Sequence, residues 1–178
     1  TCFVFFTIKK YRKKATRSLP EIRHRDVLCI SDNNICMDME RFMGLKSELP
    51  MAELLVIPME QEARTIFYRE HLEEIKKYSA VFAVSEYYAM DFIQFLKSVG
   101  LSVPADMSVI EFDNVRDCEK FVPPLTTIKQ NYNERAALAL QMLKQLKDGV
   151  CRDKNVLLPV TLVERDTVHD VNLHKKCN

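Results

Sequence analysis

Short apolar runs alternate with amphipathic stretches along the middle of the chain. The runs are rich in β-branched residues and are bounded by turn residues, which is typical of strands in a buried sheet. We expect strands at Val27–Ile30, Leu54–Ile57, Val81–Val84, Met107–Phe112 and Leu125–Gln130. Between them apolar residues recur at helical spacing, and we expect helices at Asp38–Leu49, Glu62–Tyr78 and Tyr87–Val99. This alternation predicts an α/β fold with a doubly wound parallel sheet and helices on both faces.

The same criteria predict further elements toward both ends of the chain. We expect a strand at Thr1–Thr7, a basic helix over Lys9–Arg17, a helix over Asn133–Lys147 and a strand over Val156–Glu164. Pro159 cannot donate a backbone hydrogen bond, so it places the last strand at an edge or a bend of the sheet. Val168–Asn178 is polar, and we expect it to form a loose tail.

Composition places the chain among soluble globular proteins. Its 178 residues are 47% hydrophobic and 29% charged, which suits one domain with a sizeable core. The net charge of +1 gives no general attraction to nucleic acid, and no apolar run is long enough to span a bilayer. The six cysteines show no paired metal-ligand spacing. We therefore expect reduced thiols in a cytoplasmic protein, without a bound metal or cofactor.

The sequence contains no recognisable catalytic motif. Its three glycines cannot form a glycine-rich phosphate loop, and no G-x-S-x-G nucleophile elbow occurs. We therefore expect a binding protein and not an enzyme.

Four longer segments resemble one known family. They are VFAVSEYYAM (Val81–Met90), GLSVPADMSVIEFDN (Gly100–Asn114), PPLTTIKQ (Pro123–Gln130) and LLPVTLVERDT (Leu157–Thr167). These segments resemble the lactose-repressor-like (LacI/GalR) transcription regulators, whose regulatory region has the fold of type I periplasmic sugar-binding proteins. The resemblance covers about residues 7–167 and implies mainly the carboxyl-terminal lobe of two. It assigns residues 131–149 to the other lobe, leaves residues 168–178 as the tail, and places the DNA-reading head outside this sequence.

The resemblance also implies a ligand site. Its candidate residues are Arg41, Glu86 and Gln130, with Asp32, Asn33 and Asp113 as weaker candidates. An arginine in the matching position faces the effector in the family, and a guanidinium group donates well to paired oxygens. Glu86 replaces the family's aspartate and follows a strand, where open α/β sheets bind their ligands.

Each candidate residue also has a purely structural alternative. Arg41 would otherwise form a weak surface ion pair with an acidic neighbour. Glu86 would otherwise be a favourable charge in the first turn of a helix that Ser85 caps. Gln130 would be an ordinary hinge residue, and the remaining three would form or cap turns.

The resemblance implies the effector-binding and dimerisation region of a bacterial transcription regulator. Its partners would be a small-molecule effector, a sugar or a related metabolite, and a second copy of the chain, with DNA reached only through the head. The helix at Tyr87–Leu96 is apolar nearly all round, which indicates a second packing partner and favours a homodimer. A periplasmic-type sugar-binding protein is the alternative, which the six cysteines disfavour.

Overall fold

Within the described residues of the computed structural model, six strands form one sheet in the order β2-β1-β3-β4-β5-β6. The strands are β1 (Val27–Ser31), β2 (Glu53–Val56), β3 (Ala80–Ala83), β4 (Ser108–Asp113), β5 (Thr126–Gln130) and β6 (Val160–Val163). The first five run parallel, and β6 pairs antiparallel with β5 at one edge. The predicted parallel α/β sheet is thus confirmed, with one antiparallel edge strand added.

The structure describes residues 24–32, 36–114, 116–150 and 156–169. The strand predicted at Thr1–Thr7 and the helix predicted over Lys9–Arg17 lie outside these residues. Among the described cysteines, Cys29 and Cys118 are free and buried, as expected of reduced thiols. No helix in the described part is long and apolar enough to cross a membrane.

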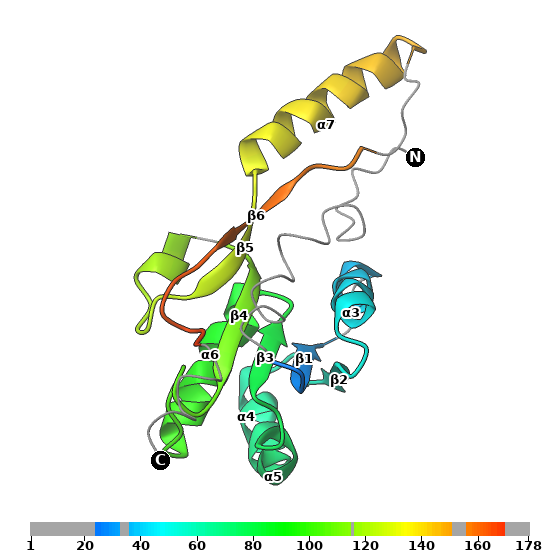
Figure 1. Cartoon of the computed structure of the whole chain (residues 1–178). Coiled ribbons are helices and arrows are strands. Elements are labelled where there is room, and N and C mark those ends of the chain that lie inside the picture. The colour runs from blue at the N-terminus through cyan, green and yellow to red at the C-terminus, as the bar shows by residue number, and fades with distance from the viewer. Residues whose placement is uncertain (1–23, 33–35, 115, 151–155, 170–178) are drawn as a thin grey trace.

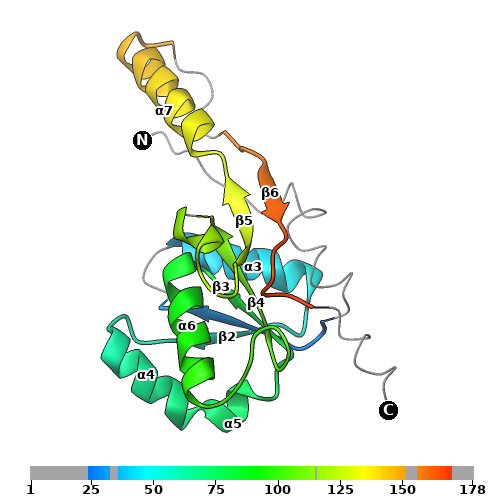
Figure 2. The ribbon, with the colours of Figure 1, turned by 90° about the vertical axis from the view of Figure 1, so that its left-hand side faces the viewer.

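Helices cover both faces of the sheet. They are α3 (Cys36–Glu48), α4 (Gln61–Glu70), α5 (Leu72–Ile75), α6 (Glu86–Ser98) and α7 (Tyr132–Lys147), with a short 3-10 helix η2 (Arg116–Glu119). Helix α3 lies on one face, and α4, α5 and α6 lie on the other (Figures 1 and 2). Helix α7 extends away from these layers, and β5 leads directly into it. The chain thus has one covered sheet and one projecting helix.

Two predicted elements are shorter than their sequence patterns indicated. The helix predicted over Glu62–Tyr78 is wrong as a single element, because it breaks at His71, whose backbone φ is −101° and ψ is 12°. The His71 ring contacts the Phe67 carbonyl oxygen at 2.9 Å and stacks on the Phe67 ring. The last strand begins only after Pro159, as the lost donor of proline requires.

The end of α6 agrees with its sequence signal. Gly100 has a φ of +80°, which an L-residue rarely adopts. Its conformation lets the Leu101 N–H donate back to the Leu96 carbonyl at 2.9 Å, closing the helix in a Schellman turn. This turn aims the chain from α6 toward β4.

Most of the apolar surface of α6 is buried inside the chain. Tyr88 and Phe92 are 8% and 0% exposed. Phe92 meets Tyr68 of α4 edge to face, with ring centroids 5.1 Å apart. Because α6 packs on both the sheet and α4, its all-round apolar pattern needs little help from another subunit. On its outward face only Tyr87, 50% exposed, and the partly buried Met90 are large and apolar.

The carboxyl-terminal segment is attached to the amino ends of β4 and β5. Thr167 is fully buried, and its hydroxyl accepts from the Thr126 N–H at 2.8 Å. The His169 N–H donates to the Ser108 hydroxyl at 3.1 Å. Residues 168 and 169, which we expected in the tail, are therefore held on the sheet, while residues 170–178 lie outside the described part.

Candidate functional site

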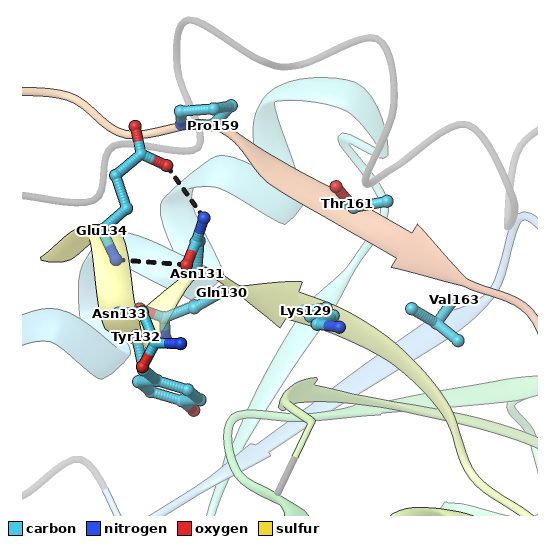
Figure 3. Close-up of a pocket in the computed structure, with 9 residues that line it drawn as sticks. All are labelled: Lys129, Gln130, Asn131, Tyr132, Asn133, Glu134, Pro159, Thr161 and Val163. Atoms are coloured by element: carbon cyan, nitrogen blue, oxygen red, sulfur yellow. Dashed lines mark hydrogen bonds between the residues drawn. The ribbon is translucent and has the colours of Figure 1, made fainter.

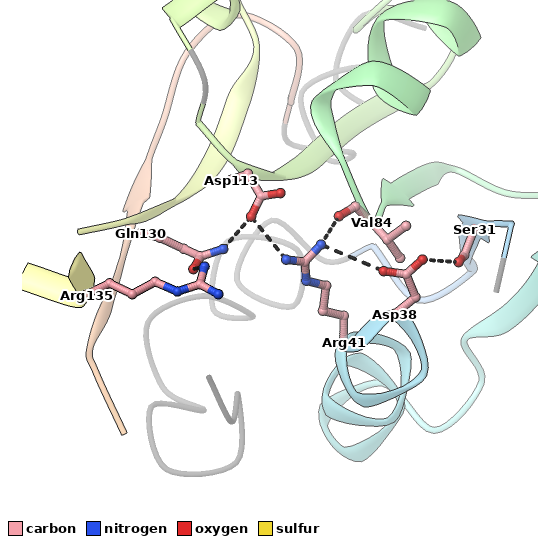
Figure 4. Close-up of polar contacts among 7 residues, drawn as sticks. All are labelled: Ser31, Asp38, Arg41, Val84, Asp113, Gln130 and Arg135. Carbon is pink, nitrogen blue, oxygen red and sulfur yellow. Dashed lines mark hydrogen bonds and ion pairs between the residues drawn. The ribbon is translucent and has the colours of Figure 1, made fainter. Parts of the chain in front are cut away.

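Four neighbouring strands end at one rim of the sheet. Ser31 ends β1, Val84 follows β3, Asp113 ends β4 and Gln130 ends β5. Because these strands are parallel, their carboxyl ends gather the groups that follow them, and α3 lies over this rim (Figure 4). The rim therefore brings together residues up to about a hundred positions apart in the sequence.

Arg41 projects from α3 into this rim and is only 8% exposed. Its guanidinium donates to the Val84 carbonyl and to the Asp113 carboxylate, the latter at 3.1 Å, and lies 3.9 Å from Asp38. It also sits over the Phe112 ring, 4.2 Å from the ring centroid. The alternative of an ion pair with an acidic neighbour is thus present at Asp38, but it is buried and not at the surface, and Arg41 also connects α3 with the ends of β3 and β4.

Asp113 is the centre of the network. Its Oδ1 accepts from both Arg41 and the Gln130 side-chain amide, and its backbone oxygen accepts from the Tyr132 hydroxyl at 2.8 Å. Burial raises the pKa of Asp113, and the opposing influence of Arg41 and Gln130 keeps the rise smaller. Its φ of 116° is strained, though aspartate tolerates positive φ better than most residues. Asp113 thus does far more than cap a turn.

Gln130 connects the rim to the projecting helix. Gln130 is 2% exposed, and its side-chain amide donates to Asp113. Its Oε1 accepts from Nη1 of Arg135 on α7 at 3.5 Å. The next residue, Asn131, caps α7, because its Oδ1 accepts from the Glu134 N–H at 3.2 Å. The crossing from β5 to α7 is therefore held by side chains from both elements.

Glu86 starts α6 beside this network. Ser85 occupies the N-cap position of α6, as expected, but its side chain makes no capping hydrogen bond. Burial raises the pKa of Glu86, Asp113 raises it further, and Arg41 lowers it. Glu86 also follows Val84, whose carbonyl accepts from Arg41, by only two residues, so α6 begins at the same rim.

Asp32 lies at the edge of the cluster. It hydrogen-bonds to Tyr88, which contributes with burial to a raised Tyr88 pKa, and it also interacts with Asp38. Asp38 in turn accepts from the Ser31 hydroxyl at 2.9 Å and approaches Arg41. Asn33 lies outside the described residues.

A pocket of about 560 Å³ opens beside the crossing (Figure 3). Its walls are Lys129, Gln130, Asn131, Tyr132, Asn133, Glu134, Pro159, Thr161 and Val163. It shares Gln130 and Tyr132 with the Asp113 network, so space for a small molecule adjoins the buried polar cluster. No group of three or more metal-binding side chains occurs among the described residues.

Comparison with known proteins identifies the family. Residues 17–168 match the profile of the periplasmic binding protein-like domain. The chain belongs to this family. The "HTH-type transcriptional repressor PurR" of Vibrio cholerae serotype O1 (strain M66-2) is 28% identical over 166 residues, which are 88% of this chain and 49% of the repressor.

Solved structures of family members agree with this assignment. A dimeric Lac repressor superposes with a TM-score of 0.80 at 24% identity, covering 93% of this chain and 63% of that one. A LacI family regulator from Enterococcus faecalis V583 with bound ribose gives 0.78 at 25% identity, covering 94% and 63%. The chain spans about half the length of the curated relatives it matches. The predicted resemblance to lactose-repressor-like regulators and the type I periplasmic-binding-protein-like fold are thus confirmed.

The site in this family member differs from the predicted set in which residue lies at its centre. Arg41, Asp113 and Gln130 form one hydrogen-bonded unit with Glu86 beside it, whereas Asp113 was only a weak candidate. Sequence reasoning missed Asp38, Tyr132 and Arg135 as parts of the cluster. Asp38 carries a local signal, since it precedes Arg41 by one helical turn. The ligand-binding role of all these residues stays a prediction.

Proposed function

We propose that this chain is the effector-binding and dimerisation region of a transcription regulator, with a sugar or a related polyhydroxylated metabolite as effector. The observation that carries the proposal is the Asp113 network at the carboxyl rim of a family fold. It lies where open α/β sheets take ligands, and a pocket adjoins it. The ribose-bound relative from Enterococcus faecalis supports the class of effector.

The proposed mechanism is closure of two lobes around the effector. Helix α7 is assigned to the second lobe, because it projects from the sheet and exposes an apolar stripe. The stripe consists of Leu140, Leu143 and Leu146, which are 61%, 61% and 42% exposed, and Val150 just after the helix is 60% exposed. A second lobe that covers it would couple its own position to the Asp113 network through Tyr132 and Gln130. An effector that binds the closed arrangement better would shift the population toward it.

Dimerisation is proposed through the surface around the start of α6. Tyr87 is 50% exposed there, and Met59 just before α4 is 63% exposed. Arg64 links the two, since its guanidinium lies 5.0 Å from the Tyr87 ring centroid and donates to the Met59 carbonyl at 2.7 Å. An exposed aromatic beside a rigid buried cation is typical of a packing hot spot.

The proposal also covers DNA binding and the location in the cell. We assign specific DNA binding to a reading head outside this sequence, as the "HTH-type" relatives suggest. We further propose that the protein acts in the cytoplasm, as expected of such a repressor. The periplasmic-type solute-binding alternative is less well supported, because the matched relatives are repressors. The same comparison favours a binding protein over an enzyme.

The proposal is tested by titrating this chain with neutral sugars. Two-dimensional NMR of the labelled chain with ribose and a panel of hexoses at high millimolar concentration should shift the amides around Asp113 and Gln130. Gln130→Ala should weaken the response, while Glu62→Ala on the exposed start of α4 should not. Shifts confined to other parts of the chain, or none with any compound, would contradict the proposed function.

A further inference from the structure

Each of the three donor side chains at the rim already has an acceptor within the chain. The Arg41 guanidinium donates to Val84 and Asp113, and the Gln130 amide also donates to Asp113. The Tyr132 hydroxyl donates to the backbone of Asp113. Part of the donor capacity at the rim is thus already directed at acceptors of the chain itself, which leaves less of it for a ligand that offers only acceptors, such as a phosphate or a carboxylate.

Acceptors, in contrast, remain open at the same place. Arg41 and Gln130 both donate to Oδ1 of the Asp113 carboxylate, and among the described residues no donor reaches its Oδ2. The Glu86 carboxylate accepts from its own backbone N–H but, among the described residues, from no side chain. Two carboxylate groups at the rim therefore keep acceptor capacity that no side chain uses, which a donor-rich ligand would satisfy.

The charge balance favours a cationic donor. Even without Glu111, carboxyl groups outnumber guanidinium groups in the cluster: Asp38, Glu86 and Asp113 stand against Arg41 and Arg135. Repulsion between Glu86 and Asp113 raises the pKa of Glu86, in addition to the effect of burial. A positive charge between the two would relieve this repulsion, whereas an anion would add to it.

A third carboxyl group lies directly behind the first two. Glu111 is fully buried two residues before Asp113 on β4, and its Oε2 has no hydrogen-bond partner among the described residues. Glu86 and Asp113 both act on it electrostatically. In its ionised form this buried group would add to the negative potential that a ligand at the rim would meet.

Building on the proposed function, we propose that the effector carries a protonated amine, bound between the Glu86 carboxylate and Asp113 Oδ2. Its hydroxyl groups would use the neighbouring pocket at Lys129–Glu134. An ammonium group supplies three donors and one positive charge, which matches two open carboxylates, and such charge-assisted bonds are about twice as strong as neutral ones. Glu86 would then be the residue that determines specificity for amines over neutral sugars.

The test compares matched pairs of ligands on this chain at neutral pH. D-glucosamine is paired with D-glucose and D-galactosamine with D-galactose, and N-acetyl-D-glucosamine serves as the uncharged amide control. NMR titration should give an affinity about tenfold higher for at least one amine than for its hydroxyl partner. Acetylation should remove that advantage, because the amide carries no charge.

The variant Glu86→Gln decides which residue is responsible. It should reduce the preference for amine over hydroxyl from about tenfold to about twofold or less. Glu62→Gln, the same change at the exposed start of α4, should leave the ratio unaltered. Added salt should weaken binding of the amines more than binding of the neutral sugars.

Several results would overturn the proposal. Equal affinity for both members of every pair would do so while leaving the proposed function intact, provided that the neutral sugars still shift the rim amides. A preference that survives Glu86→Gln would also overturn it, as would tighter binding of glucose 6-phosphate than of glucosamine. Absence of binding by every compound would refute both the inference and the proposed function.

Discussion

Replacing Glu111 by glutamine tests the electrostatic account of the rim most directly. Glu111 is fully buried on β4, and Thr127 is its register partner on β5. The Cys118 thiol of η2 donates to Oε1 at 3.4 Å, whereas Oε2 and the Thr127 hydroxyl lack a partner at normal hydrogen-bonding geometry. A proton on Oε2 would let the acid donate to that hydroxyl, so the neutral form suits this environment better than the anion.

The size of the effect follows from the pKa of Glu111. Burial raises it from an ordinary value of 4.5 to about 7, helped by Glu86 and Asp113 and opposed by Thr127 and Cys118. The folded protein therefore binds the proton more tightly than the unfolded chain. The stability that Glu111 contributes is fully present below pH 4.5 and is lost as the pH rises through 7. At about 1.4 kcal/mol per pH unit, the loss amounts to about 3 kcal/mol.

Urea denaturation between pH 5 and pH 8, followed by circular dichroism, measures this loss. Glutamine has the shape of the neutral acid and cannot ionise. The Glu111→Gln variant should therefore match the parent near pH 5 and exceed its free energy of unfolding by about 2–3 kcal/mol at pH 8. The exposed control Glu62→Gln should run parallel to the parent, within about 0.5 kcal/mol.

Parallel stability curves for Glu111→Gln and the parent would refute this reasoning. They would mean that Glu111 titrates alike in the folded and unfolded states. If Glu111→Gln were less stable than the parent by a constant amount at every pH, the Glu111 carboxylate would have a favourable partner in the folded protein. The negative potential at the rim would then be smaller than we infer.

Three other predictions concern packing and assembly. Tyr87→Glu should convert the proposed dimer to a monomer, as measured by light scattering. Met43→Glu, at a similarly exposed apolar site on α3, should not. A parent protein that is monomeric at high concentration would contradict the proposed dimer. Arg64→Ala should lower the free energy of unfolding in urea by about 3–5 kcal/mol, because it leaves Asp91 buried without its 2.6 Å partner, and adding Asp91→Ala should recover part of the loss. Leu143→Gln should change the unfolding free energy of this chain by less than about 0.5 kcal/mol, since the side chain is exposed; a larger loss in a thermal or urea melt would show that α7 packs more tightly than its exposure indicates.

The sequence by itself determined the positions of the strands and the parallel direction of β1 to β5, but not the antiparallel direction of β6. Runs such as Val81–Val84 are too short and too apolar for a surface helix, and the amphipathic stretches between them force crossovers that make neighbouring strands parallel. Local chemistry also predicted where α6 ends, because Gly100 alone fits the positive φ of that turn. These features depend on neighbours within a few residues, which a sequence pattern records.

Features that depend on contacts across the sheet were not accessible in this way. No glycine or proline at His71 indicates the break between α4 and α5 in the sequence. The burial of Tyr88 and Phe92 follows from the position of α4 over α6, which no spacing within α6 reveals. The pattern showed that α6 needed a second partner, but only the tertiary structure decided that most of this partner lies in the same chain.

The candidate site divides along the same line. Arg41, Glu86 and Gln130 could be proposed from the resemblance and from their positions after strands, because the ends of parallel strands share one rim. That Asp113 is the hub could not, since its three donors come from α3, β5 and α7. The sequence thus determined which polar groups reach the rim, whereas the tertiary structure decided which of them are engaged with one another and which are left open, because hydrogen bonds between distant segments depend on how the helices pack over the sheet.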